Sequence, residues 1–380
     1  MTNQKKRVLL YLGKFPAYGF DVDGGSILAK QLIDTLKDNC CLDVVFIRKN
    51  KEEYFDKKVN SIRYVEYKDA FNNKFIRRME NLSTNESALE NFRWYDLIIT
   101  AHISKFFGMD KYNEEFWAKT ILFPMFCAPS YQRAGEFVPL EYTEQEKIVF
   151  SKVKNVITPS ESEASDLVDY YHLDESKITI IPRGINPLFT PSADYKLHEP
   201  LKIVYIGSIK PQKNTLSTVE LLKRLKDKDL NCELHLIGTV QDKLLFSELN
   251  ALLNTNQLQS YVFFHHKLSQ IEVADVLKGM DVNISVSNWE TFGRGIYEGI
   301  TSGLPTFLLS SIECTKTICD NNPGVIYCHD IADMADQIAS LKNNPLKVEM
   351  MRKGLDEIRN KVSYEAESQN LLNCILSKLS

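Results

Sequence analysis

The sequence predicts an α/β protein built from two doubly wound, Rossmann-like domains that face each other. The chain begins its fold twice: apolar strands at Arg7–Leu12 and Leu201–Gly207 each run into a glycine-containing loop and then a helical pattern. Short apolar runs alternate with helical patterns through both halves, which is typical of parallel sheets covered on both faces. A length of 380 residues suits two such domains.

In the first half, the helix after the first strand is predicted over Ile27–Leu36. Further strands are predicted at Cys41–Ile47, Ile62–Tyr67, Leu97–Thr100, Thr120–Phe123 and Asn155–Thr158. The segment from Ile180 to Pro187, with further prolines up to Pro200, has the punctuation of a domain linker. We therefore assign residues 1–190 to the first domain.

In the second half, the helix after the restart is predicted over Leu216–Leu225. Strands are predicted at Glu233–Ile237, Tyr261–Phe264, Val282–Val286, Thr306–Leu309 and Val325–Tyr327. The second domain spans residues 191–364, and a C-terminal helix over about 365–380 is expected to pack back on the first domain. Ligands of such sheets bind beyond the carboxyl ends of the strands, so the residues that follow each strand are the candidates for function.

Composition excludes several classes of protein. The formal net charge of -4 gives no indication of a nucleic-acid binder, and the eight cysteines contain no CxxC pair that would suggest zinc or redox chemistry. The basic start Lys5-Lys6-Arg7 precedes an apolar run too short for a signal peptide, and no stretch is long enough to span a membrane. We expect a cytoplasmic protein, with peripheral attachment to the inner face of the membrane left open.

The strongest motif follows the strand that ends at Val286. It runs from Ser287 to Gly299 and is followed by Gly303-Leu304-Pro305. Gly293 and Gly295 allow the backbone to approach a ligand closely, and the helix they open would present its N-terminal amides to a phosphate. Glu290 and Glu298 are eight residues apart, which lets one carboxylate meet a sugar and the other the hydroxyls of a ribose. A helix start with ordinary surface acids is the alternative.

This region resembles the retaining, family-four glycosyltransferases of the GT-B fold, whose motif is Ser-x-x-Glu-x-Phe-Gly, a second Glu, and then Gly-x-Pro. Other parts of the chain resemble the family in the same order. They are Gly24-Gly25, the strand from Asp96 ending in His102, Val156–Ser160, Ile181–Asn186 and Gly207–Asn214. The resemblance implies a nucleotide-sugar donor, with UDP or GDP as its nucleotide, and a glycan, lipid-linked or small-molecule acceptor. It also implies retention at the anomeric carbon without a metal or other cofactor, and a place in bacterial polysaccharide or glycoconjugate assembly.

Residue roles follow from the resemblance. Glu290, His102 and Lys213 would be the catalytic residues, with the Lys213 ammonium facing the donor diphosphate. The donor-binding residues would be Glu298, Phe292, Gly293, Arg294, Ser208, Gly24, Gly25, Arg183 and His266. For Gly24-Gly25 a tight turn before a helix is an equal alternative.

The chain departs from the family pattern at three places. Ser208 replaces the arginine that follows the loop glycine, so one positive charge toward the phosphates is missing, which Lys213, Arg294 or Arg183 would have to supply. Arg183-Gly184-Ile185-Asn186 replaces Asn-Gly-Val-Asp, and Phe264-His265-His266 replaces Phe-x-Gly beside the nucleotide base. Adjacent histidines on a strand point to opposite sides, so the pair is not expected to bind a metal together.

Three other features support weaker interpretations. Asp21-Val22-Asp23 resembles a metal-binding Asp-x-Asp but lacks the context of metal-dependent transferases. Lys74, Arg77 and Arg78 form a basic cluster that suits either a membrane surface or an ordinary solvated face. The aromatic residues between Phe106 and Tyr131 are expected to be mostly core, with the loop from Pro124 to Pro139 shaping an acceptor pocket.

Rival functions remain open at this stage. In the same fold, they are a sugar-nucleotide epimerase and a phosphorylase. From another class, Ser208 leaves room for a catalytically inert subunit that binds sugar nucleotides. A nicotinamide dehydrogenase is disfavoured because neither restart carries Gly-x-Gly-x-x-Gly.

Overall fold

The computed structural model describes residues 5–12, 24–49, 55–59, 62–69, 92–193, 195–266 and 268–379. The chain divides into two compact units. Unit 1 consists of Met1–Arg133, Phe137–Pro182 and Glu367–Ser380, and unit 2 of Ala134–Glu136 and Arg183–Ala366. The Asp21-Val22-Asp23 segment and the cluster of Lys74, Arg77 and Arg78 lie outside the described residues.

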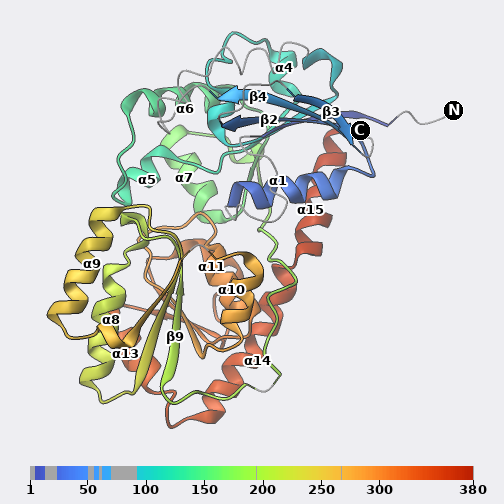
Figure 1. Ribbon diagram of the computed structural model, residues 1–380. Helices are drawn as coiled ribbons and strands as arrows, with labels where there is room; N and C mark the ends of the chain where they lie inside the picture. The colour runs from blue at the N-terminus through green and yellow to red at the C-terminus, as the bar shows by residue number, and fades with distance from the viewer. Residues whose placement is uncertain are drawn as a thin grey trace. The chain divides into compact units, whose positions relative to one another are not determined.

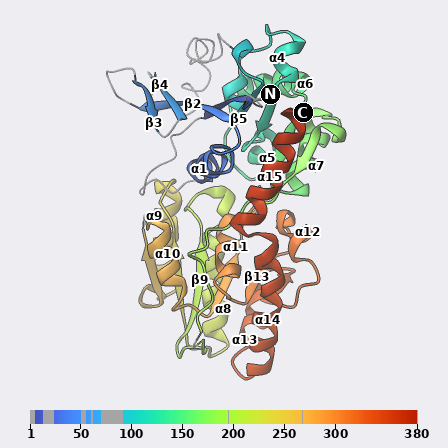
Figure 2. The ribbon, with the colours of Figure 1, turned by 90° about the vertical axis from the view of Figure 1, so that its right-hand side faces the viewer.

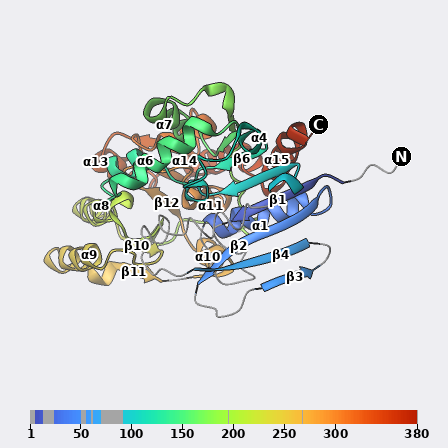
Figure 3. The same ribbon diagram turned by 90° about the horizontal axis from the view of Figure 1, so that it is seen from above.

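Unit 1 contains an eight-stranded sheet in the order β3-β4-β2-β1-β5-β6-β7-β8. Its strands are β1 (Arg7–Leu12), β2 (Cys41–Lys49), β3 (Phe55–Val59), β4 (Ile62–Asp69), β5 (Leu97–Ala101), β6 (Thr120–Phe123), β7 (Val156–Thr158) and β8 (Ile178–Ile180). Every predicted strand of this half is present. The two strands that the sequence did not predict, β3 and β8, are the edges of the sheet, and β3 pairs with β4 in the antiparallel sense (Figure 3).

The helices of unit 1 bury an aromatic core. They are α1 (Gly24–Leu36), α4 (Glu114–Ala118), α5 (Ala128–Arg133), α6 (Leu140–Lys152) and α7 (Glu161–Tyr171), with short 3-10 turns η1 (Phe92–Trp94), η2 (Ile103–Phe106) and η3 (Glu175–Lys177). Phe106, Phe107, Phe116 and Trp117 are almost completely buried. The prediction that these aromatic residues form core is confirmed.

The C-terminal helix α15 (Tyr364–Leu379) belongs to unit 1 from Glu367 onward. It lies beside α1, as Figures 1 and 2 show, and both helices contribute leucines and isoleucines to one apolar cluster. The Ser368 hydroxyl accepts hydrogen bonds from the side chains of Gln31 and Thr35 at 3.2 and 3.3 Å. The end of the chain therefore completes the first core.

Unit 2 contains a six-stranded parallel sheet in the order β11-β10-β9-β12-β13-β14. Its strands are β9 (Leu201–Ile206), β10 (Cys232–Ile237), β11 (Val262–His265), β12 (Val282–Ser285), β13 (Thr306–Leu309) and β14 (Val325–Cys328). All were predicted. The strand order reverses between β9 and β12, and ligands of open α/β sheets bind at the carboxyl ends on either side of such a reversal.

Helices cover both faces of this sheet, so unit 2 is doubly wound (Figure 1). They are η4 (Pro211–Lys213), α8 (Leu216–Asp227), α9 (Lys243–Thr255), η5 (Gln259–Tyr261), α10 (Gln270–Leu277), α11 (Arg294–Thr301), η6 (Glu313–Thr315), α12 (Lys316–Cys319), α13 (Ile331–Ala339) and α14 (Pro345–Lys361). One apolar cluster joins α8, α9 and α13 to one face, and a second joins α10 and α11 to the other. The predicted fold class, two Rossmann-like α/β domains, is confirmed.

Candidate functional site

The candidate site of unit 2 is formed by the two loops that follow β9 and β12, at the reversal of strand order. The first loop runs through residues 207–214, and the second runs through residues 286–293 into α11. Gln212, almost completely buried, joins them: its amide nitrogen donates to the Trp289 carbonyl at 2.8 Å. The backbone carbonyl of Gln212 accepts from the backbone N–H of Asn288 at 2.9 Å. The two loops are thereby held as one surface.

A buried ion pair lies on this surface. The Lys213 ammonium donates to Oε1 of Glu290 at 2.5 Å, and the Ser287 hydroxyl donates to the same oxygen at 2.8 Å. Both charged side chains are largely shielded from water, with exposed fractions of 18% and 9%. Within the described part of the chain, Oε2 of Glu290 accepts no hydrogen bond, so this oxygen is the one able to bind a ligand hydroxyl.

Glu298 lies on the second turn of α11 and is 8% exposed. Among the residues that the structure describes, none donates a hydrogen bond to its carboxylate. Burial raises the pKa of Glu298 to about 7, against a smaller opposite effect of the positive charges of Arg294 and Lys213. A buried carboxylate without a partner is costly, which favours a ligand whose hydroxyl groups donate to it.

The N-terminus of α11 faces the same loops. Gly293 precedes the helix in the left-handed conformation, with φ 77°, which favours glycine, and no side chain caps the helix. The first amides of a helix lack partners within it and attract anions. Arg294, the first residue of α11, donates from Nη1 to the carbonyl of Gly184 at 3.1 Å, so the segment beginning at buried Arg183 lies beside this helix.

Gly295 brings α11 close to β9. A Cβ on Gly295 would lie 2.4 Å from the carbonyl oxygen of Ile206 and 2.9 Å from the Ile206 Cβ. Because backbone would have to move, we expect Gly295→Ala to lower the free energy of unfolding by about 1–3 kcal/mol. Denaturant titration measures this. Gly279→Ala is the matched control, since its Cβ would meet nothing closer than 3.7 Å, and equal effects of the two substitutions would contradict the packing argument.

Three further residues predicted to bind the donor are Ser208, Phe292 and His266. Ser208 follows Gly207, whose N–H donates to the Ile237 carbonyl at 2.8 Å, so its backbone is fixed at the end of β9. Phe292 is 4% exposed, and the centroid of its ring lies 4.4 Å from that of Tyr297, on which it stacks. The ring is therefore part of the core beneath α11. His266 is exposed beyond β11.

The two adjacent histidines point to opposite sides, as predicted. His266 contacts the ring of Phe246 on α9, whereas Nε2 of His265 lies 3.0 Å from Nδ1 of His235 on β10. Burial, and then the neighbouring His265, lower the pKa of His235 to about 4. The His235 ring is therefore neutral at physiological pH.

The predicted residues of unit 1 lie at the carboxyl ends of β1 and β5. His102 directly follows β5 and has φ 105°, an unfavourable conformation for a residue other than glycine. Its Nδ1 accepts the N–H of Ser104 at 3.2 Å, so a neutral ring carries its proton on Nε2. Gly24 and Gly25 are the first two residues of α1, and residues 13–23 before them are not described.

Sequence reasoning did not list Ser287 and Gln212 as site residues. The position of Ser287, three residues before Glu290 in the motif, was a usable signal for it. Gln212 carried none, because its role is a contact between loops that are 77 residues apart. No described helix is long and apolar enough to cross a membrane, and the described residues contain no group of three potential metal ligands.

Two family models match the chain. The one described as Glycosyltransferase Family 4 matches residues 22–188, and the one described as Glycosyl transferases group 1 matches residues 192–360. A D-inositol 3-phosphate glycosyltransferase of Stackebrandtia nassauensis is 29% identical over 227 residues, 55% of this chain and 51% of that protein. Another, from Arthrobacter sp., is 24% identical over 201 residues, 50% of this chain and 48% of that protein. The chain thus spans about half the length of these relatives.

Solved structures share the fold at low sequence identity. Sucrose-phosphate synthase from Thermosynechococcus elongatus superposes with a TM-score of 0.78 at 17% identity, covering 98% of this chain and 99% of that one. The Anabaena protein HepE, solved in complex with UDP and glucose, gives a TM-score of 0.74 at 11% identity and covers 98% of this chain and 100% of its own.

Proposed function

Since the chain belongs to the family-four, group 1 glycosyltransferases, we propose that it transfers a sugar from a nucleotide-sugar donor to an acceptor with retention of the anomeric configuration. The observation that carries this proposal is the Lys213–Glu290 pair at the N-terminus of α11, with the unpartnered carboxylate of Glu298 further along that helix. Together they offer a cation and amides for a diphosphate and two carboxylates for hydroxyl groups.

Each group has one role in this proposal. The donor diphosphate binds at the first amides of α11 and the Lys213 ammonium, where negative charge grows as the bond to the sugar breaks. The ribose hydroxyls donate to Glu298. Oε2 of Glu290 accepts from a hydroxyl of the donor sugar, while Ser287 and Lys213 hold Oε1.

The proposed transfer occurs on one face of the sugar. The bond between the anomeric carbon and the phosphate oxygen breaks, and the acceptor oxygen bonds to the same face of that carbon. The acceptor proton passes to the departing phosphate oxygen, so charge balances without a separate base. His102, which directly follows β5, would contact the donor sugar or the acceptor.

The donor and acceptor classes are also proposals. HepE was solved with UDP and glucose, which supports a UDP-sugar ahead of a GDP-sugar. The relatives' names, D-inositol 3-phosphate glycosyltransferase and sucrose-phosphate synthase, put phosphorylated polyols and sugar phosphates among the acceptors to test. Glycan and lipid-linked acceptors of bacterial envelope assembly remain the other class, and peripheral membrane contact would accompany the lipid-linked kind.

A thermal-shift screen against nucleotide sugars tests the proposal first. A ligand at one hundred times its Kd stabilises a protein by about 2.7 kcal/mol, which a melting curve detects. We expect UDP, GDP or one of their sugar derivatives to raise the Tm, and adenosine diphosphate to serve as the comparison. If the protein responds to no nucleotide sugar, the proposed function is wrong.

We expect turnover to be retaining and independent of added metal. The chain's own cation and helix amides are available for the leaving diphosphate, so a divalent ion is not required there. Product NMR should show the anomeric configuration of the donor, and chelator-washed enzyme should keep its rate. An inverted product, or strict dependence on manganese or magnesium, would contradict this mechanism.

A catalytically inert binding subunit is the second candidate, and Ser208 favours it because an arginine's charge is missing there. The two candidates differ in one measurement. Donor binding without transfer to any acceptor, and without slow hydrolysis of the donor, would support the inert subunit. Release of UDP or GDP that depends on an acceptor would support the transferase.

A further inference from the structure

We propose that Tyr205 is a positioning residue of the donor site, whose buried hydroxyl fixes the loop that carries Lys213. The inference rests on the proposed function, because it concerns the diphosphate end of that site. Tyr205 is the fifth residue of β9 and only 1% exposed, so by burial alone it is a core residue. Its hydroxyl has contacts that the core does not require.

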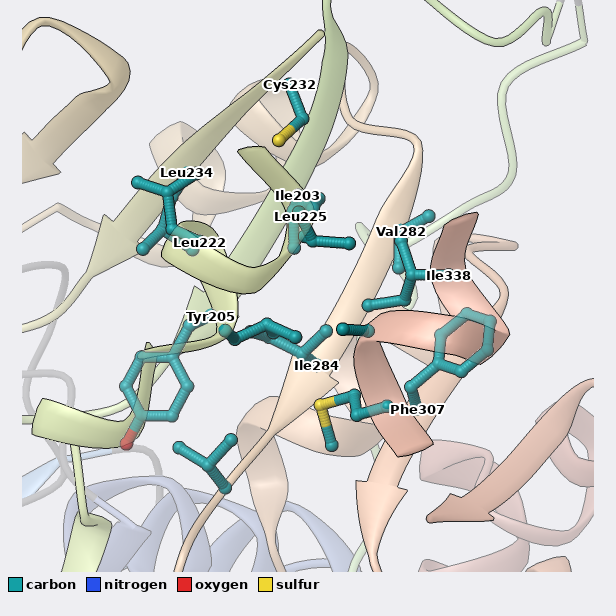
Figure 4. Packing of buried hydrophobic residues seen from close by; sticks show 14 of the residues in the cluster. Ile203, Tyr205, Leu222, Leu225, Cys232, Leu234, Val282, Ile284, Phe307 and Ile338 are labelled. Carbon is teal, nitrogen blue, oxygen red and sulfur yellow. The ribbon is translucent and has the colours of Figure 1, made fainter. Parts of the chain in front are cut away.

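The ring and the hydroxyl of Tyr205 have different surroundings. The ring packs in the apolar cluster of unit 2, and Figure 4 shows the hydroxyl oxygen pointing away from the labelled aliphatic side chains. The hydroxyl lies beneath Gly207, where a Cβ would come within 2.7 Å of it. The hydroxyl thus lies directly under the loop that begins at Gly207 and ends at Lys213.

The hydroxyl donates to the backbone carbonyl of Lys213 at 3.1 Å. This bond spans the turn between the end of β9 and α8, and it fixes the Cα from which the Lys213 side chain extends. The side chains of Thr215 and Ser287 are both near enough to this hydroxyl to lower its pKa slightly, and the Ser287 hydroxyl donates to Oε1 of Glu290. One buried oxygen is therefore close to the backbone of one member of the ion pair and to the hydroxyl that holds the other.

The phenol remains a donor at any physiological pH. Burial, and then the negative charge of Glu290, raise the pKa of Tyr205. A buried hydroxyl costs free energy unless it is hydrogen-bonded, and a phenylalanine would fill the same apolar space without that cost. Core packing does not explain why the hydroxyl lies under the loop. A role in holding Lys213 does explain it.

The test is a double-mutant cycle on nucleotide affinity. UDP is the probe, with GDP used instead if the thermal-shift screen selects it, and calorimetry gives the Kd for wild type, Tyr205→Phe, Lys213→Ala and the double variant. We expect Tyr205→Phe to weaken binding about threefold to tenfold, the effect of one lost hydrogen bond. In the Lys213→Ala background the same substitution should change the Kd by less than about twofold, because Tyr205 acts through Lys213.

Tyr195→Phe is the matched control. Its hydroxyl also donates to a backbone carbonyl, that of Asp281 at 2.7 Å, but Asp281 precedes β12 at the opposite end of the sheet. The two phenylalanine variants should have similar melting temperatures, and Tyr195→Phe should keep the wild-type Kd. Equal weakening by Tyr205→Phe with and without Lys213, or no weakening, would overturn the inference. Failure of the wild-type protein to bind either nucleotide would instead count against the proposed function.

Discussion

Replacing Lys213 with alanine is expected to lower turnover by a factor on the order of one hundred or more, with a smaller effect on donor affinity. The physical reason is that negative charge grows on the leaving diphosphate, where a cation held in place is worth most. Glu290 holds the Lys213 ammonium at 2.5 Å before any ligand binds. Ser208 stands at the position of the family's arginine, and the other cation of this loop, Lys210, is paired with Glu136 at 3.2 Å.

Comparison with the two arginines decides whether Lys213 has this role. Arg294 uses one nitrogen of its guanidinium on the Gly184 carbonyl, so we expect Arg294→Ala to have a smaller effect on turnover. Arg183→Ala completes the set of single variants. Near-normal turnover of Lys213→Ala, together with abolished turnover of either arginine variant, would show that the assignment of Lys213 is wrong.

Three further variants separate the loss of charge from the loss of folding stability. Removing Lys213 leaves Glu290 as a buried carboxylate without its cation, which lowers stability as well as activity. Lys213→Gln keeps a hydrogen-bond donor and should fold better than Lys213→Ala while remaining nearly as slow. Ser208→Arg in the Lys213→Ala background should restore part of the rate. Lys223→Ala, on the exposed side of α8, should be indistinguishable from wild type in both rate and Tm.

The sequence predicts the strands whose apolar residues are buried in the interior of a sheet. Five- or six-residue apolar runs such as Arg7–Leu12 and Leu201–Ile206 are buried on both faces of a parallel sheet, and each was found. The two missed strands lie at edges. Phe55–Val59 reads Phe-Asp-Lys-Lys-Val, with charges that edge strands commonly carry, and Ile178–Ile180 has only three residues.

The candidate site could be predicted in its strand-end residues but not in the contacts that hold them. The motif around Glu290 and Glu298 identified the carboxylates. Tyr205 could not be distinguished from a core residue, because the apolar pattern of β9 reports where its ring lies and not where its hydroxyl points. The contact of Gln212 with Trp289 depends on the meeting of two loops, which only the folded sheet determines.

Glu298→Ala is expected to weaken binding of the cognate nucleotide by about 1.5–3 kcal/mol, the range for a hydrogen bond to a charged group. The ribose hydroxyls would lose their acceptor, and water replaces it poorly because Glu298 is only 8% exposed. Calorimetry with the nucleotide selected by the screen measures the loss. An unchanged Kd would remove Glu298 from the site.

The effect of Glu298 on stability can be tested by comparing the wild type with Glu298→Gln as the pH is varied. The pKa of Glu298 in the folded state, about 7, lies above the ordinary value of 4.5. Between these two pH values the carboxyl group is therefore protonated in the folded state and ionised in the unfolded state. Stability is therefore lost as pH rises from 4.5 through 7, by roughly 3 kcal/mol in full. Glutamine cannot ionise, so at pH 8 the variant without ligand should be more stable than wild type, and near pH 5 the two should converge.

Nucleotide binding should respond to pH in the opposite sense from stability. On the proposed role, the ionised carboxylate of Glu298 would accept hydrogen bonds from both ribose hydroxyls, so wild-type affinity should rise between pH 6 and 8 and binding should release protons. The nucleotide's own phosphate also titrates in this range and contributes to the pH dependence of binding. This contribution is the same for Glu298→Gln, so the variant measures it separately. The difference between the two proteins, measured by calorimetry in buffers of different ionisation enthalpy, isolates Glu298. Parallel pH profiles for wild type and Glu298→Gln would mean that the carboxylate does not meet the ribose.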